Sequence, residues 1–454
     1  LHSTCQTLSS SSFISHFLSN HLLGFHFEMR SLLLSFLFAL AITATVSNIS
    51  NEVMSKEEKE WRDHAVKLLW DERGKMGHTP LYRIEGAQMP GFPMVDMYIK
   101  NETASKSETL KHRFVWALIL WAVTEGKIKS NTSVYDSTSG NTGSSEAYMC
   151  SLIGVNYTAV IADNLEEEKR DQIKRFGGIL YPVPVDQRNK VAAELAYNNS
   201  GFFINQFGNA DSAEEYHESG GYGMETTNVF HEIATQLNET SKPHPNYFIH
   251  SAGTGGTISS VGKYISRYSI QTKVVLADSQ YSLFYDYVLN NNYTNVSAGQ
   301  AGRPDWVKPG IAGIGYGYNP DPIIFQNTTS LLRTVIDEVV RMPDMATVAA
   351  MRSLRALNID GGASTALNFL VSLYKAIVHA EGNDKTPETE RMSMVFIMGD
   401  PGRFYESTYY NDTYVDHNMA HLGGMKTLNC WKAKIDDAIA NGTNFIKNAT
   451  ACNI

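Results

Sequence analysis

A lysine at the start of an amphipathic segment and two loops of small residues are the parts of this sequence best suited to chemistry. Lys111 begins the segment, and the loops are Ser137-Thr-Ser-Gly-Asn-Thr-Gly143 and Gly253-Thr-Gly-Gly-Thr257. The positive end of a helix dipole disfavours the ammonium form of a lysine, so a first-turn Lys111 would more readily supply a neutral, nucleophilic amine. A glycine-rich loop ahead of a helix presents backbone N–H groups that can hold a phosphate.

The second loop, Gly253–Thr257, departs from the two common nucleotide-binding patterns. No Gly-Lys-Ser/Thr follows it, as a Walker loop requires, and Ile258 stands where a dinucleotide-binding loop has its third glycine. What remains is either a nest of backbone N–H groups with the hydroxyls of Thr254 and Thr257, or a plain tight turn. Because a reactive amine accompanies this loop in a chain whose cysteine spacings match no zinc site, the sequence predicts pyridoxal 5'-phosphate bound as a Schiff base to Lys111.

The first loop, Ser137–Gly143, follows an apolar strand candidate and precedes a helical pattern. That pattern includes Glu146, Ala147, Met149 and Cys150. Small residues at the start of a helix let backbone N–H groups approach a carboxylate or a cofactor closely. The arrangement therefore favours a substrate or cofactor role for this loop over a merely solvated one.

Short apolar runs alternate with helical patterns between residues 55 and 412, which predicts an α/β architecture with mostly parallel strands buried on both faces. A helix that begins near Thr109 or Leu110 would place Lys111 in its first turn. A strand over Tyr247–Ser251 and a helix over Ile258–Ser266 would put the second loop at the end of a strand, where open α/β sheets bind ligands. The expected strands are Met94–Ile99, Tyr157–Ala162, Gly178–Val183, Gly201–Ile204, Tyr247–His250, Val274–Ala277 and Met394–Met398.

The composition limits the class of protein. The chain has 454 residues, of which 43% are hydrophobic, enough for two domains with their own cores. Its formal net charge is −9 and no segment gathers lysines and arginines, so nucleic acid is not an expected partner. Beyond the N-terminal region, no apolar run reaches the ~20 residues that a membrane helix needs.

Residues 29–47 have the pattern of a secretory signal peptide. Met29-Arg30 gives a charged start, a short apolar run follows, and small residues lead to a cleavage position near Ser47. A membrane anchor is the alternative interpretation, although the apolar run is short for one. Because residue 1 is Leu, residues 1–28 are expected to be upstream sequence that is not native to the protein.

Sequons and cysteines agree with secretion. Twelve Asn-x-Ser/Thr sequons predict an N-glycosylated, secreted product with no membrane association once the signal is removed. In an oxidising compartment Cys430 and Cys452 could pair, whereas Cys150 lies in an apolar helical stretch and is expected to be a buried structural thiol. The sequons begin at Asn48, Asn101, Asn131, Asn156, Asn198, Asn238, Asn292, Asn295, Asn327, Asn411, Asn441 and Asn448.

Six motifs in this order resemble the cysteine synthase / cystathionine β-synthase family. They are His78-Thr-Pro-Leu81, Thr109-Leu-Lys-His-Arg113, Ser137–Gly143, Gln206-Phe207, Gly253–Thr257 and Gly313-Ile-Gly315. Three segments are similar to a bacterial L-cysteine desulfhydrase branch of that family: Leu-Lys-His-Arg113, Ser-Glu-Ala-Tyr148 and Ser407-Thr-Tyr-Tyr410.

The resemblance implies the second fold type of pyridoxal-phosphate enzymes. Its members have two open, twisted, mostly parallel sheet domains with the cofactor in the cleft between them. We expect an N-terminal α/β domain over residues 48–240 that carries the lysine and the substrate loop. A C-terminal α/β domain over residues 241–412 would carry the phosphate loop, and residues 413–454 would form an appended tail.

The resemblance also implies roles by position. Lys111 would carry the cofactor, and Asn141 would hydrogen-bond its phenolic oxygen. The phosphate would be held by Gly253, Thr254, Gly255, Gly256 and Thr257. The carboxylate of an amino-acid substrate would be held by Thr138, Ser139, Thr142 and Gln206.

The implied reaction is β-elimination or β-replacement on cysteine or a related β-substituted amino acid, as in cysteine desulfhydrases or cysteine synthases. The sequence leaves the choice between them open, because it depends on the access of a second nucleophile. A homodimer is expected by analogy with the family alone.

Two positions depart from the family pattern. In Asp400-Pro401-Gly402, Pro401 replaces a serine that meets the pyridine nitrogen, and proline offers no side-chain donor or acceptor. Glu108 stands where the bacterial branch has glycine. Pro401 and the secretory destination keep a second hypothesis open, in which the chain is a secreted, non-catalytic relative that retains the fold, with or without the cofactor.

Overall fold

The computed structural model describes residues 54–210, 213, 225–238, 240, 242–291, 311–315, 329–382, 390–447 and 452. It separates the chain into two units, Leu1–Lys59 and Glu60–Ile454, and both sheets belong to the second. The predicted signal peptide and residues 1–28 lie outside the described residues. Among the described helices, none is both long and apolar enough to cross a membrane.

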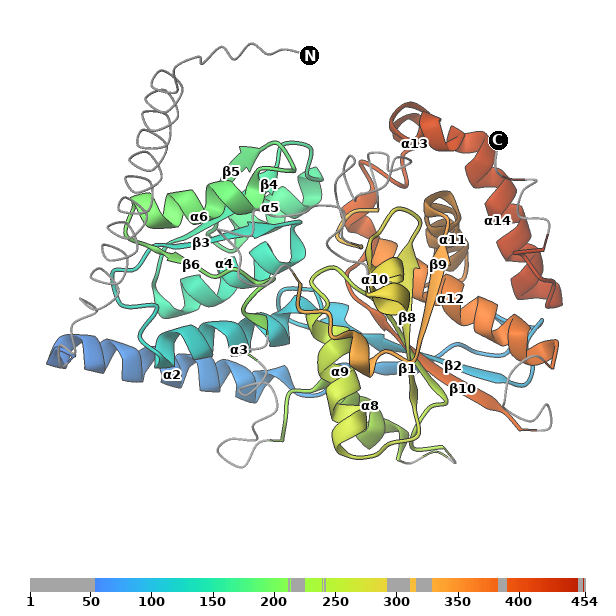
Figure 1. Cartoon of the computed structure of the whole chain (residues 1–454), viewed down its shortest axis with the longest axis horizontal. Coiled ribbons are helices and arrows are strands. Elements are labelled where there is room, and N and C mark those ends of the chain that lie inside the picture. The colour runs from blue at the N-terminus through green and yellow to red at the C-terminus, as the bar shows by residue number, and fades with distance from the viewer. Residues whose placement is uncertain are drawn as a thin grey trace, which may run out of the picture. The chain divides into compact units, whose positions relative to one another are not determined.

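The larger sheet has six strands in the order β1-β2-β10-β7-β8-β9, and every neighbouring pair is parallel except β1 with β2. Strands β2 and β10 lie side by side although they are far apart in the sequence (Figure 1). Tyr247 and Ile249 of β7 pack with α11, α12 and α14, whereas Phe248 packs with α8 and α9. Because successive strand residues point to opposite faces, a continuously apolar strand such as β7 requires helices on both faces.

The smaller sheet has four parallel strands in the order β5-β4-β3-β6. On one face, Leu69 of α2, Trp116 of α3 and Met149 of α4 share a buried apolar cluster. On the other face, Ala192 of α6 packs against Val160 of β4. Helix α3, which carries Lys111, is therefore fixed along its apolar length by α2, α4 and the sheet.

The bounds of the elements are as follows. The strands are β1 (Leu81–Arg83), β2 (Val95–Asn101), β3 (Val134–Thr138), β4 (Tyr157–Ala162), β5 (Ile179–Val183), β6 (Phe202–Phe203), β7 (Tyr247–Ser251), β8 (Lys273–Ser279), β9 (Glu338–Met342) and β10 (Met392–Met398). The α-helices are α2 (Lys56–Met76), α3 (Lys111–Thr124), α4 (Asn141–Ile153), α5 (Glu167–Arg175), α6 (Arg188–Asn198), α8 (Val229–Leu237), α9 (Gly256–Arg267), α10 (Phe284–Asn290), α11 (Asp344–Ala356), α12 (Ala363–Ala380), α13 (Asp412–Asn418) and α14 (Gly424–Asn441). Short 3-10 helices are η1 (Glu102–Ala104), η3 (Arg333–Val335), η4 (Gly402–Tyr405) and η5 (Ala420–Leu422).

The predicted α/β class with two mostly parallel sheets is confirmed, and each of the seven expected strands is present. The strand candidate ahead of Ser137 is β3. The sequence does not predict β1 and β9, which lie at the two edges of the larger sheet. Both are short and partly exposed, and β9 includes Glu338 and Arg341, so neither presents the apolar run that marks a buried strand.

The two sheets do not follow the linear order of the chain. Strands β1 and β2 come from its first part, yet they complete the sheet formed by β7 to β10. The chain therefore passes from the larger sheet to the helices of the smaller sheet between β2 and α3. Lys111, the first residue of α3, lies at this crossing.

The described part of residues 413–454 packs into the core of the larger sheet. Helix α14 buries Leu428, Trp431 and Ile435 in the same apolar cluster as α11 and α12. A disulfide joins Cys430 to Cys452, with their Cα atoms 5.6 Å apart. The pairing that the sequence allowed is therefore present, and Cys150 is a buried free thiol as predicted.

Candidate active site

Lys111 occupies the first position of α3, as its sequence context predicts. Its backbone N–H donates to Thr109 Oγ1 at 3.1 Å, and the N–H of Leu110 donates to Gly399 O at 2.8 Å, which ties the start of the helix to the end of β10. Burial lowers the pKa of Lys111 to about 8, and the Glu146 carboxylate opposes that change. Lys111 can therefore present a neutral amine close to neutral pH, which nucleophilic or basic chemistry requires.

The substrate loop connects β3 to α4 with glycine at its tightest point. Gly140 has a φ of +118°, and a Cβ there would lie 2.6 Å from Lys169 Cδ, so the site accepts no side chain. The predicted carboxylate ligand Thr138 accepts hydrogen bonds at Oγ1 from the N–H groups of Gly140, at 3.0 Å, and Gly143, at 2.9 Å. Its hydroxyl hydrogen can still be donated to a ligand.

The other predicted carboxylate ligands lie on or beside the same loop. Thr142 Oγ1 donates to Gln206 Oε1 at 2.7 Å, and Gln206 Nε2 donates to Ser137 O at 2.7 Å. This network brings Thr142 and Gln206 together, as the resemblance implies. Ser139 lies against the Gly313-Ile-Gly315 segment, because a Cβ on Gly313 would come within 3.4 Å of Ser139 Oγ.

The phosphate loop connects β7 to α9 and is packed too closely for side chains. Gly255, the residue before α9, has a φ of +90°, and a Cβ there would lie 2.4 Å from Leu331 N. Thr254 holds the turn, because its Oγ1 accepts from Gly256 N at 3.3 Å and its carbonyl accepts from Ser330 N at 2.9 Å. The amides at the start of α9 form the anion-binding end of a helix.

A small cavity brings this loop to the lysine helix. Gly256 and Thr257 of α9 line it together with Leu110 and Phe114, which flank Lys111. Lys111 itself does not line this cavity, and its Nζ lies 5.7 Å from the centre of the Phe114 ring, which does.

Asn141 and Asp400 carry unused polar atoms in the interior. Asn141 Nδ2 donates to Asp400 Oδ2 at 2.9 Å, and the Tyr405 hydroxyl donates to the same oxygen at 2.7 Å. In the described part of the chain, Asn141 Oδ1 and Asp400 Oδ1 are buried without a hydrogen-bond partner. Such atoms mark a place where a polar ligand group can bind. Together with the Lys111 amine and the glycine cradle, they fit pyridoxal phosphate.

Pro401 adopts a conformation that suits proline and offers no side-chain donor or acceptor. Its φ is −78°, and it forms an isolated bridge with Gly361. A Cβ on Gly361 would lie 2.5 Å from Thr365 Cγ2, and Thr365 Oγ1 is a buried hydroxyl with no partner among the described residues. Asp400 Oδ1 and Thr365 Oγ1 are therefore the unused oxygens on this side of the site.

The second departure, Glu108, has a local explanation. Its φ is +59°, the left-handed region that glycine adopts without cost. Two arginines hold the glutamate there, since Glu108 Oε2 lies 2.9 Å from Arg175 Nη2 and 2.7 Å from Arg403 Nη2.

A buried pair of carboxyl groups near Lys111 was not identified from the sequence. Asp136 of β3 and Glu146 of α4 interact directly, and the Tyr157 hydroxyl donates to Glu146 Oε2 at 2.6 Å. Burial raises the pKa of Asp136 to about 7 and that of Glu146 well above its usual range. An acidic residue on an otherwise small and apolar helix face is the one signal that could have marked Glu146.

His250 of β7 is a further titratable group near the lysine. Burial, with the nearby Lys111 charge, lowers its pKa to about 3, so the ring is neutral. Lys111 is therefore influenced by Glu146, which favours its ammonium form, and by His250, which adds no charge.

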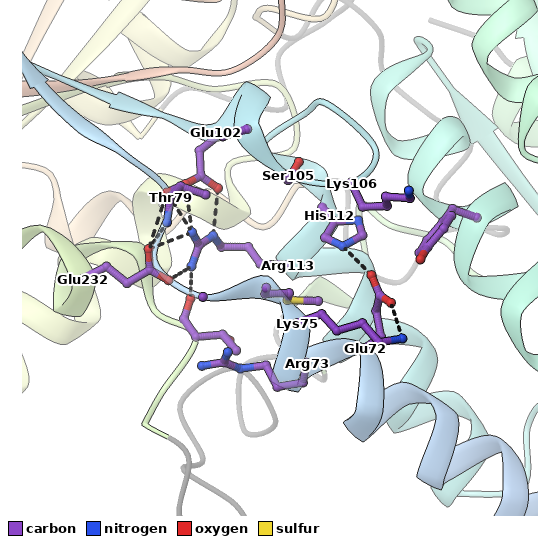
Figure 2. Close-up of a pocket in the computed structure, with 15 residues that line it drawn as sticks. Glu72, Arg73, Lys75, Thr79, Glu102, Ser105, Lys106, His112, Arg113 and Glu232 are labelled. Carbon is purple, nitrogen blue, oxygen red and sulfur yellow. Dashed lines mark hydrogen bonds and ion pairs between the residues drawn. The ribbon is translucent and has the colours of Figure 1, made fainter.

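A second cavity, of about 380 Å³, lies beside α3 and is shown in Figure 2. His112 and Arg113 line it, whereas Lys111 does not. Arg113 Nε lies 2.8 Å from Glu102 Oε2 and Arg113 Nη1 lies 2.6 Å from Glu232 Oε1. The full lining is Glu72, Arg73, Lys75, Met76, Gly77, Thr79, Glu102, Ala104, Ser105, Lys106, His112, Arg113, Tyr148, Thr227 and Glu232.

Comparisons with known sequences agree on one family. A family model described as "Pyridoxal-phosphate dependent enzyme" matches residues 73–386. A Caenorhabditis elegans protein, F13B12.4, whose name gives a provisional pyridoxal-phosphate dependence and no reaction, is 53% identical over 89% of this chain and 93% of its own length. L-cysteine desulfhydrase Cds1 of Mycobacterium tuberculosis is 29% identical over 79% of this chain and 90% of its own length.

Solved structures share the fold. The crystal structure of O-ureido-L-serine synthase matches with a TM-score of 0.58 at 24% identity, covering 79% of this chain and 98% of that one. A hydrogen sulfide-producing enzyme from Fusobacterium nucleatum matches with a TM-score of 0.57 at 23% identity, covering 75% of this chain and 98% of that one.

Proposed function

The chain belongs to the pyridoxal-phosphate dependent enzymes of the cysteine synthase and cystathionine β-synthase type, with their second fold type, and from this premise we propose that it acts at the β-carbon of an amino acid. The reaction is β-elimination or β-replacement on cysteine or a related β-substituted amino acid. The observation that carries this proposal is the position of Lys111, half-buried as the first residue of α3, where Leu110 N donates to Gly399 O at 2.8 Å and ties the helix to the end of β10.

Each group of site residues has a task in this reaction. When bound, pyridoxal phosphate supplies a ring that withdraws electrons and so stabilises negative charge at the substrate's α-carbon. Lys111 Nζ, once free, accepts the proton from that carbon and can return it. The first turn of α9 and the loop Gly253–Thr257 would hold the phosphate, and Asn141 would bind the phenolic oxygen in exchange for its bond to Asp400.

The substrate loop orients the amino acid. The hydroxyls of Thr138, Ser139 and Thr142 and the N–H groups at the start of α4 offer donors to the substrate carboxylate. Gln206 keeps Thr142 in place through the 2.7 Å bond to its Oε1. A carboxylate held there fixes the α-carbon relative to Lys111, and such orientation is the main way in which a binding loop raises a rate.

The names of two similar proteins, an L-cysteine desulfhydrase and a hydrogen sulfide-producing enzyme, favour elimination with release of sulfide as the first activity to test. We expect the purified protein to show the absorbance of a lysine-linked pyridoxal and to release sulfide and pyruvate from L-cysteine. Both properties should be lost in Lys111→Ala. Addition of a second thiol then reports replacement, because a new β-substituted amino acid forms at the expense of pyruvate.

A non-catalytic relative is the competing proposal, and Pro401 is the observation that favours it. A wild-type protein that carries the cofactor on Lys111 but converts no cysteine, with or without added thiol, would support it. Pro401→Ser separates the two proposals further. If the missing serine limits the reaction, this variant should change the cofactor spectrum or the rate.

We also propose a secretory destination with N-glycosylation. Of the seven sequon asparagines among the described residues, all but Asn101 are exposed. Asn101 Oδ1 instead accepts from Thr103 N at 3.1 Å and caps η1. Protein expressed in animal cells should therefore shift in mass on treatment with a glycosidase, and peptide mapping should find Asn101 unmodified.

A further inference from the structure

The cavity of about 380 Å³ beside α3 takes no part in the proposed reaction. We propose that it binds a small anionic metabolite bearing a carboxylate or phosphate group, at a site separate from that of Lys111. The argument depends on which of the cavity's polar groups are already saturated and which still have hydrogen-bonding capacity.

The acidic groups of the inner wall are saturated. Arg113 contacts both Glu102 and Glu232, and Lys100 Nζ lies 2.8 Å from Glu232 Oε2. The Thr79 hydroxyl donates to Glu102 Oε1 at 2.7 Å. In the part of the chain that the structure describes, neither glutamate has a buried oxygen without a partner. These carboxylates therefore have little left to offer to a cationic ligand.

Glu72, on the opposite wall, is also engaged. His112 Nε2 lies 3.4 Å from Glu72 Oε1, as Figure 2 shows. The hydrogen bond from His112 outweighs burial, and a further one from Tyr148 adds to it, so the pKa of Glu72 is lowered. Glu72 therefore remains a carboxylate that already has its partners.

The cations that line the cavity retain free donors. Arg73 is buried, at 8% exposure, and its one hydrogen bond within the described residues runs from Nη2 to the carbonyl of Glu225 at 2.9 Å. A guanidinium has five N–H donors, so most of those of Arg73 are available. Lys75 forms a long ion pair with Glu72, 3.7 Å from Nζ to Oε2, which is beyond hydrogen-bond distance and leaves its N–H donors able to bind a ligand. Lys106 is exposed at the cavity.

The two acidic side chains that act on Arg73, Glu232 and Glu225, both have other partners. Glu225 Oε1 lies 2.8 Å from His78 Nε2, and Glu225 Oε2 lies 2.6 Å from His231 Nε2. Arg73, Lys75 and Lys106 thus offer donors where the acceptors are used up, which is the condition for binding an anion. The cavity volume is that of a small-molecule site.

The position of the cavity gives such a ligand access to the lysine helix. His112 and Arg113 follow Lys111 directly in the first turn of α3. Glu102 and Arg113 also line the small cavity beside Gly256 and Thr257. Binding itself does not rest on the proposed function, since it involves neither Lys111 nor the cofactor.

The test is titration of the full chain, saturated with pyridoxal phosphate, by calorimetry. The probes are inorganic phosphate and succinate, with sodium chloride at the same ionic strength as the reference. We expect at least one probe to bind, and its affinity to fall at least tenfold in the double variant Lys75→Ala/Lys106→Ala. Both lysines are exposed, so this variant should fold. The matched control is Lys127→Ala/Lys190→Ala, two exposed lysines outside the cavity, which should bind as the wild type does.

Each outcome decides the proposal. Binding of phosphate alone, or of succinate alone, assigns the site to that anion. Binding that the cavity variant does not weaken, or the absence of binding above the chloride reference, overturns the proposal. Failure of the enzyme proposal is distinguishable, because it would appear as a missing Lys111-linked absorbance while the anion titration and its response to Lys75→Ala/Lys106→Ala stayed the same.

Discussion

Two groups of buried carboxyls lie near the first turn of α3, and only one of them is paired with cations. Glu102 and Glu232, each 2% exposed, are bonded to Arg113, and Lys100 adds a second cation. Asp136 and Glu146, each fully buried, have each other and the hydroxyl of Tyr157. Backbone N–H groups of Ser137, Asn205 and Gln206 also act on Asp136 and lower its pKa, but neither carboxyl forms an ion pair with a cation among the described residues.

The difference determines which groups carry charge. Burial alone would raise the pKa of Glu232, but Arg113 and Lys100 outweigh it and lower that pKa to about 2. Burial raises the pKa of Asp136 to about 7, with no cation close enough to reverse it. A buried carboxyl with cationic partners is thus a fixed structural charge. One without them retains a proton that it can exchange with its surroundings.

The largest change in stability should come from removing Arg113, the cation that pairs with Glu102 and Glu232. Arg113→Met would leave Glu102 and Glu232 with only Lys100, and an unpaired buried charge of this kind costs about 3–5 kcal/mol of unfolding free energy. Urea unfolding measures the loss. The double variant Arg113→Met/Glu102→Gln should recover much of it, because it removes one buried charge of each sign and leaves Glu232 paired with Lys100 at 2.8 Å.

The control for that change is Arg175→Met, which removes an exposed arginine paired with Glu108. Such a surface pair contributes about 0–1 kcal/mol. If Arg113→Met lowered the unfolding free energy no more than Arg175→Met does, Arg113 would not be what stabilises the buried charges of Glu102 and Glu232.

The uncompensated pair should respond to pH in the opposite sense to Glu232. The folded pKa of Asp136 is about 7, against about 4 in an unfolded chain, so the folded state holds an extra proton between these values. The unfolding free energy therefore falls as pH rises from about 4 to about 7, and Asp136 alone contributes a slope of at most about 1.4 kcal/mol per pH unit to that fall. Asp136→Asn should lack this slope. Its unfolding free energy should therefore increase relative to that of the wild type as pH rises from about 4 to about 7.

The Glu232 contribution runs the other way. Its folded pKa of about 2 lies below the unfolded value, so its stabilisation is present above about pH 4.5 and disappears as pH falls toward 2. Unfolding curves at several pH values compare both acids in one experiment. Parallel profiles for wild type and Asp136→Asn between pH 4 and pH 7 would contradict a native proton on Asp136.

The sequence could predict the parts of this molecule that depend on local patterns. Apolar runs marked the buried strands, and the small residues of the two loops marked the starts of α4 and α9. The acid groups depend on tertiary contacts instead. Glu102, Arg113 and Glu232 come from three separate elements, and Glu146 has the spacing of an ordinary helix residue until β3 places Asp136 beside it.

A smaller effect is expected on the reactivity of Lys111. Glu146 raises the pKa of Lys111 only in its carboxylate form, and burial beside Asp136 raises the pKa of Glu146 well above its usual range. Glu146→Gln, which resembles the protonated side chain, should therefore leave the neutral fraction of the Lys111 amine nearly unchanged near pH 7. Competitive acetylation of cofactor-free protein, read by mass spectrometry, should show Lys111 labelled at nearly the wild-type rate near pH 7. Glu166→Gln is the matched control, because Glu166 is also buried but lies 3.4 Å from its own partner, Lys169. If Lys111 were labelled several-fold faster in Glu146→Gln than in Glu166→Gln, Glu146 would be a carboxylate at this pH, which would contradict a retained proton on it.

The smallest change in stability is expected at Glu108, which is partly exposed, because ion pairs near the solvent contribute little to the unfolding free energy. Glu108 adopts a φ of +59° and pairs with Arg175 and Arg403. Glu108→Ala keeps the left-handed backbone and loses both pairs, whereas Glu108→Gly loses the pairs but relieves a backbone strain of about 1–2 kcal/mol. Glycine in turn adds freedom to the unfolded chain, worth about 0.5–1 kcal/mol.

These terms nearly cancel, so Glu108→Gly should unfold within about 1 kcal/mol of the wild type and be the more stable of the two variants. Urea unfolding of both variants measures the difference at a single pH. If Glu108→Ala were at least as stable as Glu108→Gly, the left-handed backbone at this position would cost no unfolding free energy. The ion pairs with Arg175 and Arg403 would then not be needed to offset such a cost. The unfolding free energy lost with a cationic partner would then be measurable only at the buried acids Glu102 and Glu232, through Arg113→Met.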